Sequence, residues 1–239
     1  MARFVLVHGA WQGLWCWREV TPRLTVEGHD AAAFDLPAHG RDKAPPEIVT
    51  MQHYVDRIRQ EILASAQDVI LVGHSMGGVV SQAAEEIHAR VRALVYIAAL
   101  VPPNGCEMLK FVASYDPQFV KEFVWSSDGR TAGITPDGAR QFLYTHCATD
   151  DVESVLPLFT AEPVAPFATP VTLTDRSYGR IPRYYIECLR DRAVPIELQR
   201  SMQTATSFQG IYSLNTDHSP FFSMPQKLAE ILHDIAKQL

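Results

Sequence analysis

Short apolar runs alternate along the chain with segments in which apolar residues recur at a helical period. Residues 4–7, 69–72 and 93–101 are apolar without polar alternation, which is typical of strands buried on both faces. In 51–62 and 76–87, apolar residues recur every three or four positions, as on one face of a helix. Strands separated by helices predict a parallel sheet with helices on both faces.

The same pattern predicts the other elements of the sheet and its helices. We expect further strands at 31–35, 183–188 and 211–214 and further helices at 17–26, 196–205 and 226–239. The predicted fold class is therefore α/β, with a mostly parallel, doubly wound sheet of about six strands. This is the architecture in which helices on both faces leave the strand ends free to carry a site.

The segment 102–182 differs from the rest in its many prolines, short polar turns and scattered aromatic residues. We expect it to start and return at the carboxyl ends of the strands, where parallel sheets bind ligands. We interpret it as a mainly helical cap inserted into a core formed by 1–101 and 183–239. A surface excursion with a small core of its own fits the same pattern.

Composition excludes some classes of function. The chain has 239 residues, 47% hydrophobic and 20% charged, which fits one α/β domain with an insertion. A net charge of −6 without a basic run argues against nucleic acid as a partner. The cysteines form no C-x-x-C motif and predict free thiols rather than zinc ligands; they are Cys16, Cys106, Cys147 and Cys188.

The amino terminus leads directly into the first expected strand and has no signal-peptide pattern, and no run is long enough to span a membrane. We therefore expect a cytoplasmic protein without a membrane partner. Secretion by a route without a signal sequence stays open, and so does a homodimer.

A G-x-S-x-G motif, Gly73 to Gly77, lies between an expected strand and an expected helix. In this context the motif predicts a nucleophile elbow, a tight turn that presents Ser75 at the carboxyl edge of the sheet. The two glycines lack the Cβ atoms that would crowd such a turn. We expect the backbone N–H groups of Met76, which opens the helix, and of Ala10, in the loop after the first strand, to form an oxyanion hole.

A serine nucleophile needs a base, and in hydrolases with this elbow the base follows the serine in the chain. His218 comes just after the last expected strand, at the edge where Ser75 emerges. His88 and His233 fall within expected helices, and His146 falls in the cap. Position therefore favours His218 as the base.

The base in turn needs an acid that orients it. Asp191 follows the expected strand 183–188 and so lies at the same edge of the sheet. Asp175 lies in the cap, and Asp217 adjoins His218 and points elsewhere. We predict that Asp191 is the acid; the alternative is a turn residue paired with the arginines beside it.

The residues that carry this chemistry resemble a known family. The matching stretches are Phe4–Ala10, Gly28-His29, Phe34-Asp35-Leu36, Val69–Gly78, Tyr144-Thr145 with Cys147, Tyr178-Gly179, Arg183–Asp191 and Asp217-His218. They resemble the α/β-hydrolase superfamily, and more narrowly the plant methylesterase and hydroxynitrile lyase group with its bacterial carboxylesterase members. The resemblance implies a triad of Ser75, Asp191 and His218, an oxyanion hole from Ala10 and Met76, and no metal or organic cofactor.

Three positions distinguish the activities within that group. In the lyases of the group that this chain resembles, the first loop has His-Thr, where this chain has His8-Gly9. The residue before the serine is Glu in those lyases and His74 in this chain. They also carry a Lys after the histidine, which holds the cyanide, and this chain has Ser219 there. All three positions favour an esterase.

The sequence thus predicts a serine carboxylic-ester hydrolase that acts on small apolar or aromatic esters. The residues expected to bind the substrate are Gly9, Trp11, His74, Phe111, Phe119, Trp125, Phe142 and Phe159. The aromatic members of this set have core packing as an equal alternative. A lyase or a carbon–carbon bond hydrolase on the same scaffold stays open, as does a small-molecule receptor without catalysis.

Overall fold

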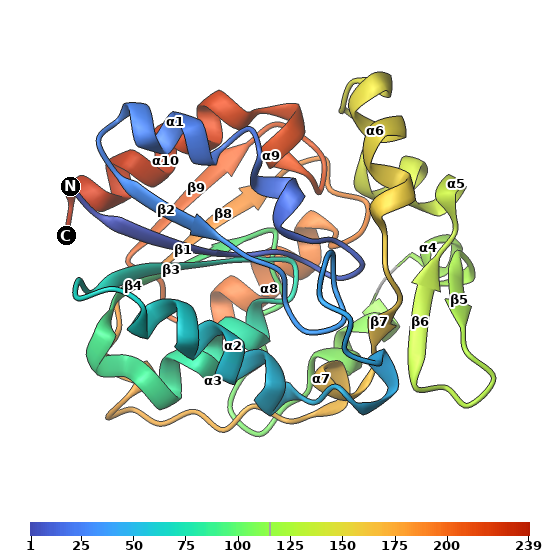
Figure 1. Cartoon of the computed structure of the whole chain (residues 1–239), viewed down its shortest axis with the longest axis horizontal. Coiled ribbons are helices and arrows are strands. Elements are labelled where there is room, and N and C mark those ends of the chain that lie inside the picture. The colour runs from blue at the N-terminus through green and yellow to red at the C-terminus, as the bar shows by residue number, and fades with distance from the viewer. Residues whose placement is uncertain (115) are drawn as a thin grey trace.

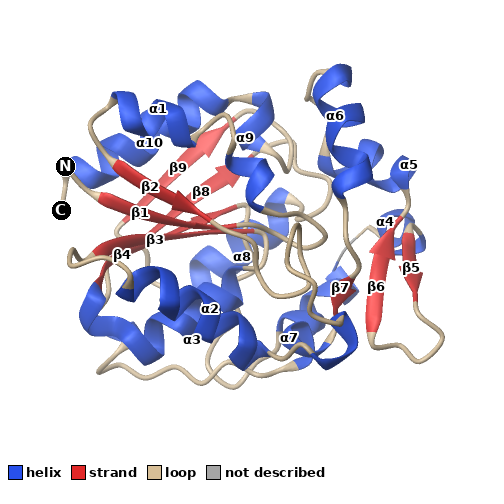
Figure 2. Ribbon diagram, viewed as in Figure 1, coloured by secondary structure: helices blue, strands red, loops and turns tan. Residues whose placement is uncertain are grey.

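A six-stranded sheet crosses the protein in the order β2-β1-β3-β4-β8-β9 (Figures 1 and 2). The computed structural model describes residues 1–114 and 116–239, with the backbone alone at 112–114. All neighbouring strands of this sheet are parallel. The strands are β1 (Arg3–Val7), β2 (Asp30–Ala33), β3 (Val69–His74), β4 (Val91–Ile97), β8 (Arg183–Cys188) and β9 (Gly210–Leu214).

Helices cover both faces of the sheet, which confirms the predicted doubly wound fold. On one face lie α1 (Thr21–Val26) and α10 (Pro225–Lys237), and on the other lie α2 (Met51–Leu63) and α3 (Gly77–Ile87) (Figure 1). The helix α8 (Ile196–Ala205) connects β8 to β9. Because helices cover both faces, the central strand β3 is buried at all six positions, and this is why its sequence lacks polar alternation.

Residues 116–168, between β4 and β8, lie beyond the carboxyl ends of the strands, whereas both chain termini lie at the opposite end of the molecule (Figure 1). After α7 (Ala165–Ala168) the chain runs back along the molecule and enters β8 at its amino end, because β8 is parallel to β4. The segment thus starts at the carboxyl edge of the sheet but returns at the amino edge, so the expectation that it returns at the carboxyl edge was wrong. Besides helices it contains a three-stranded antiparallel sheet in the order β5-β6-β7, which the sequence analysis did not predict. Its elements are α4 (Pro117–Lys121), β5 (Phe123–Trp125), β6 (Thr131–Ile134), α5 (Pro136–Gly138), a π-helical turn (Ala139–Leu143), α6 (Thr149–Val155), β7 (Glu162–Pro163) and α7 (Ala165–Ala168).

Short turns of 3-10 helix and one more α-helical turn complete the chain. They are Leu14–Trp17, Pro46–Ile48, His88–Arg90, Met108–Ser114, Leu156–Leu158, Tyr178–Arg180 and α9 (Pro220–Ser223).

Several expected elements have other bounds than the pattern suggested, and two of the differences have a clear physical reason. The helix expected at 17–26 starts only at Thr21, because Pro22 suits the first turn of a helix and not its interior. The apolar run through Val101 stops being a strand at Ile97, since Ala98 has a φ of +45°. Residues 98–101 stay buried because they pack against the turn that holds Ser75.

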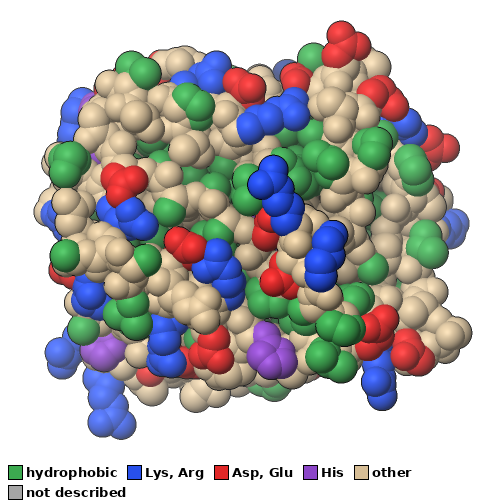
Figure 3. Space-filling view, viewed as in Figure 1, with side chains coloured by type: hydrophobic (Ala, Val, Ile, Leu, Met, Phe, Trp, Pro, Cys, Tyr) green, Lys and Arg blue, Asp and Glu red, His purple; other side chains and the backbone are tan. Residues whose placement is uncertain are grey.

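Positive and negative side chains are interspersed over the face shown in Figure 3. Within the described ranges, no helix has the length and apolar character needed to cross a lipid bilayer. The four cysteines are free thiols, two of them buried.

Candidate active site

Ser75 occupies the turn between β3 and α3 in a left-handed conformation, with a φ of +58°. A non-glycine residue adopts this region at a cost, so the surrounding backbone must hold it there. Ser75 N–H donates to the carbonyl of Ile97 at 3.1 Å, and the Ser75 carbonyl accepts from the N–H of Leu100 at 2.7 Å. The segment after β4 thus fixes the turn that presents the serine hydroxyl.

Two glycines make room for this turn. A Cβ atom on Gly77 would lie 2.5 Å from the carbonyl oxygen of Leu100, which is closer than real Cβ atoms approach. A Cβ atom on Gly9 would lie 2.7 Å from His74 Nδ1 and 2.9 Å from the Cβ of Ser75. Both positions therefore need glycine because other parts of the site come too close to them.

His218 lies in the loop between β9 and α9 and connects Ser75 to Asp191. Its Nε2 is 3.1 Å from Ser75 Oγ, and its Nδ1 is 2.6 Å from Asp191 Oδ2. Nδ1 faces a carboxylate and therefore carries the proton, so Nε2 is free to accept one from the serine hydroxyl. The structure brings together the three side chains that the sequence analysis selected as nucleophile, base and acid.

Asp191 is held from several sides in the loop after β8. Its Oδ1 accepts hydrogen bonds from the N–H groups of Ala193 and Val194, each at 2.8 Å. Burial raises the pKa of Asp191 above its ordinary value, although His218 and these two N–H groups act in the opposite direction. A carboxylate with so little water around it interacts strongly with a cationic ring beside it.

The two expected oxyanion donors differ in their present partners. The Ala10 N–H has no acceptor among the residues that the structure describes. The Met76 N–H donates to the carbonyl of His74 at 2.6 Å within the tight turn. Ala10 also lines the cavity beside Ser75, so its N–H is the donor that is free for a new acceptor.

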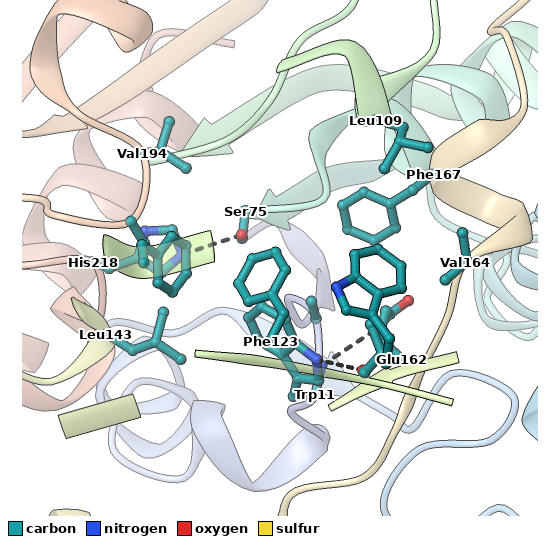
Figure 4. A pocket seen from close by; sticks show the side chains of 15 residues that line it. Trp11, Ser75, Leu109, Phe123, Leu143, Glu162, Val164, Phe167, Val194 and His218 are labelled. Atoms are coloured by element: carbon teal, nitrogen blue, oxygen red, sulfur yellow. Dashed lines mark hydrogen bonds between the residues drawn. The ribbon is translucent and has the colours of Figure 1, made fainter. Parts of the chain in front are cut away.

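A cavity of about 50 Å³ lies between the sheet edge and the cap (Figure 4). It is lined by Ala10, Trp11, Ser75, Leu109, Phe119, Phe123, Trp125, Ala132, Leu143, Glu162, Val164, Phe167, Ala193, Val194 and His218. Most of these side chains are apolar, and Ser75 and His218 lie together at one side (Figure 4). An apolar cavity with few polar groups is typical of a small-molecule site.

Three of the expected substrate-binding residues line this cavity: Trp11, Phe119 and Trp125. Gly9 does not line the cavity; it contacts Ser75 and His74 so closely that a side chain at this position would clash with them. His74 also lies outside the cavity, because its ring packs behind the ring of His218, with 4.6 Å between their centroids.

The other three expected residues, all Phe, pack elsewhere within the described part of the chain. Phe111 is half-buried against the core. Phe142 does not line the cavity, and its ring lies 4.9 Å from that of Phe119. Phe159 stacks on Trp15, with 5.8 Å between the ring centroids. For these residues, core packing was the better interpretation, because aromatic side chains in a cap also have to form its own interior.

Sequence reasoning missed several lining residues. Phe123 and Phe167 belong to the aromatic residues of the cap and were visible as such. Glu162 gave no signal, because a carboxylate in a proline-rich stretch is usually a surface residue. Among the residues that the structure describes, no group of three His, Cys, Asp or Glu side chains is arranged to hold a metal ion.

The sheet order and the serine turn define the α/β-hydrolase class, and the chain belongs to the alpha/beta hydrolase family, whose profile matches residues 4–231. It is 32% identical over 252 residues to methylesterase 7 of Arabidopsis thaliana, covering 98% of this chain and 96% of that protein. It is also 32% identical to putative methylesterase 11, chloroplastic, of that plant, covering 98% of this chain and 64% of that relative's length. The crystal structure of polyneuridine aldehyde esterase superposes with a TM-score of 0.92 over 99% of both chains at 24% identity, which shows the shared fold.

Proposed function

We propose that this protein is a serine carboxylic-ester hydrolase that acts on small apolar or aromatic esters through an acyl-enzyme. The observation that carries the proposal is the continuous hydrogen bonding from Ser75 Oγ through the His218 ring to Asp191, beside a mostly apolar cavity. The similarity to methylesterase 7 over nearly the whole chain supports ester hydrolysis.

In the first half of the reaction, Ser75 Oγ attacks the ester carbonyl while His218 Nε2 takes its proton. Asp191 keeps the proton on Nδ1 and stabilises the cationic ring that forms. His218 then gives the proton to the departing alcohol, and the acyl group stays on Ser75. Water repeats the same sequence and releases the acid.

The negative oxygen of the tetrahedral intermediate would be held by backbone donors. Ala10 N–H has no competing acceptor among the described residues, and Met76 N–H lies in the turn directly after Ser75. A donor of this kind typically contributes about 2.7–4 kcal/mol to lowering the barrier. Only the backbone takes part, so the side chains at these positions need only be small enough to leave room.

The size of the cavity limits the substrate. A volume of about 50 Å³ is well below that of typical ligand sites, so an ester with an aromatic ring has to displace cap side chains as it enters. The lining favours apolar acyl or alcohol groups. It contains no Lys or Arg among the described residues, which supports an esterase over a lyase that must hold a departing anion.

The experiment that tests this proposal compares the wild type with Ser75→Ala on p-nitrophenyl acetate and on methyl phenylacetate. We expect the variant to lose more than about 10⁴-fold in kcat. Mass spectrometry of the wild type, quenched during turnover, should find the acyl group on the peptide that contains Ser75. Ser65→Ala, in the turn after α2 at the other edge of the sheet, is the control and should keep wild-type activity.

Equal turnover by the wild type and Ser75→Ala would show that Ser75 is not the nucleophile. A folded wild type that hydrolyses none of these esters would contradict ester hydrolysis, and carbon–carbon cleavage or ligand binding would then be tested by product analysis and by calorimetry.

A further inference from the structure

One carboxylate lines the otherwise mostly apolar cavity. Glu162, in the short cap strand β7, is 3% exposed and lies across the cavity from His218 (Figure 4). A charged side chain is almost never this buried unless its polar atoms have partners. Ester hydrolysis by Ser75 and His218 assigns no role to it.

Three donors from the core hold Glu162. The N–H of Trp11, at 3.2 Å, and the ring Nε2 of His39, at 2.8 Å, both donate to Oε2. The hydroxyl of Tyr54 donates to Oε1 at 3.0 Å. Each carboxylate oxygen can accept two hydrogen bonds, so Oε2 is fully used, whereas Oε1 accepts this one bond from the described residues and has capacity for another.

The charge of the site follows from the surroundings of His39. Its Nδ1 lies 3.0 Å from the carbonyl oxygen of Pro37, and its Nε2 lies 2.8 Å from Glu162. Both neighbours are acceptors, and the Tyr54 hydroxyl, 3.5 Å from Nδ1, gives its proton to Glu162 instead. Each ring nitrogen therefore carries a proton, and the ring is cationic. Burial alone would lower the pKa of His39, but the charge and hydrogen bond of Glu162, with the Pro37 carbonyl, raise it above its ordinary value.

Glu162 and His39 thus form a buried ion pair without net charge. An ammonium group entering the cavity would lose its water without meeting an unbalanced negative charge. A neutral donor loses less on entry and can still form a strong hydrogen bond to a carboxylate oxygen.

We propose that Glu162 Oε1 is a polar subsite that accepts a hydrogen bond from a neutral hydroxyl or amide N–H of the substrate, at a part remote from the scissile carbonyl. The natural substrates are then hydroxylated or amide-bearing small esters. The claim that hydroxylated esters are turned over rests on the proposed function. The claim that Glu162 binds a neutral donor does not depend on it.

The first test uses matched esters with the wild type. Methyl phenylacetate, methyl 3-phenylpropanoate and the acetates of the corresponding alcohols are each compared with their meta- and para-hydroxyl and methoxy derivatives. For at least one ester, at the meta or the para position, kcat/KM for the hydroxyl compound should exceed that of the unsubstituted and of the methoxy compound by about tenfold or more. The methoxy compound keeps the oxygen but cannot donate a hydrogen bond, and the unsubstituted compound, which is smaller than the hydroxyl compound, shows whether added bulk alone changes the rate.

The second test is Glu162→Gln. The amide oxygen can accept from Trp11 and His39 in place of Oε2, and the amide nitrogen then donates to the Tyr54 oxygen where Oε1 was an acceptor. The hydroxyl preference should fall to less than about threefold, since the acceptor is gone. A residue that only fastens the cap would change all esters by one common factor and leave the preference intact.

Glu153→Gln is the matched control. Glu153 is a cap carboxylate that pairs with Arg140 outside the cavity, so its loss should leave the hydroxyl preference unchanged. If Glu162→Gln does not fold, the wild-type ester series still decides, because it needs no variant.

Calorimetry with Ser75→Ala separates the two proposals. If the wild type hydrolyses the unsubstituted esters with no hydroxyl preference in any series, the subsite is wrong and the esterase stands. If no ester is hydrolysed, but Ser75→Ala binds a hydroxyl compound about tenfold more tightly than its methoxy partner and Glu162→Gln abolishes the difference, the esterase is wrong and the subsite stands.

Discussion

His74 donates a hydrogen bond from its ring Nε2 to the backbone carbonyl of His218, with 2.7 Å between the two atoms. Burial, followed by the charge of His218, lowers the pKa of His74 well below its ordinary value, so the ring is neutral. Its Nδ1 has no partner within the described part of the chain. The residue before the serine is therefore a positioning residue for the histidine that touches the serine.

We predict that His74→Phe lowers kcat about tenfold with little change in KM. The phenyl ring fills similar space but leaves the buried His218 carbonyl unpaired, at a cost of about 1–3 kcal/mol that loosens the loop. Steady-state kinetics on p-nitrophenyl acetate measures this effect. His74→Gln restores a donor and should recover part of kcat; a purely structural role would lower the melting temperature of His74→Phe and leave its kcat unchanged.

Asp191→Asn should lower kcat by about 10³–10⁴-fold while the fold persists. An amide nitrogen facing His218 Nδ1 forces the ring proton onto Nε2, and the ring then cannot accept a proton from Ser75. Activity assays, together with circular dichroism to check folding, measure the loss.

Asp217→Asn is the matched control, because Asp217 adjoins His218 but accepts from the N–H groups of His146 and Ser219 instead of the imidazole. We expect it to lose far less than Asp191→Asn. A larger loss in Asp217→Asn would mean that the wrong acid was chosen.

The sheet could be predicted from the sequence because its strands are buried on both faces and its helices have one apolar face each. Strand 183–188 and helix 196–205 were predicted with the bounds that the structure gives them. Ser75, His218 and Asp191 could be located for the same reason, since each follows a strand and the carboxyl ends of parallel strands share one edge.

The cap was less predictable, because its pieces are short. The strand β7 has two residues, and its pairing with β6 depends on contacts between distant parts of the chain that no local pattern shows. The position of Glu162 depends on the same pairing. Phe159 stacks on Trp15 instead of lining the cavity, and this choice depends on three-dimensional packing, which the residue type does not reveal.

His8 predicts how stability depends on pH. Burial, and then the charge of His39, lower its pKa from 6.5 to about 3. Its Nε2 accepts a hydrogen bond from the N–H of Leu36, and a proton on Nε2 would break that bond. The unfolded chain takes up that proton near pH 6.5. The contribution of neutral His8 is therefore complete above that pH and is lost as the pH falls, by about 1.4 kcal/mol per pH unit.

Urea unfolding at pH 7.5, 6.5, 5.5 and 5 measures this dependence. His8→Gln, whose amide also offers a donor and an acceptor, should flatten the slope below pH 6.5 by about one proton. His39 acts in the opposite direction and at higher pH, since its raised pKa gives a contribution to stability that is complete below pH 6.5 and is lost as the pH rises above it. His39→Gln should therefore remove this loss between pH 6.5 and 7.5 and change the slope little at lower pH. Parallel curves for the wild type and His8→Gln would contradict the role of His8.

Trp125 predicts which part of the site limits substrate size. Its side chain lines the cavity, yet the residue is 47% exposed, and its ring lies 6.3 Å from that of Phe123. Trp125→Ala should therefore open the cavity outward at little cost in stability, within about 1 kcal/mol. We expect kcat/KM for p-nitrophenyl hexanoate, relative to the acetate, to rise about tenfold, since longer acyl groups no longer have to displace the indole.

Val124→Ala is the control, because the neighbouring residue on β5 is also exposed but does not line the cavity. An unchanged chain-length preference in Trp125→Ala would place the size limit deeper in the cavity, at the ring of Phe119 or Phe123.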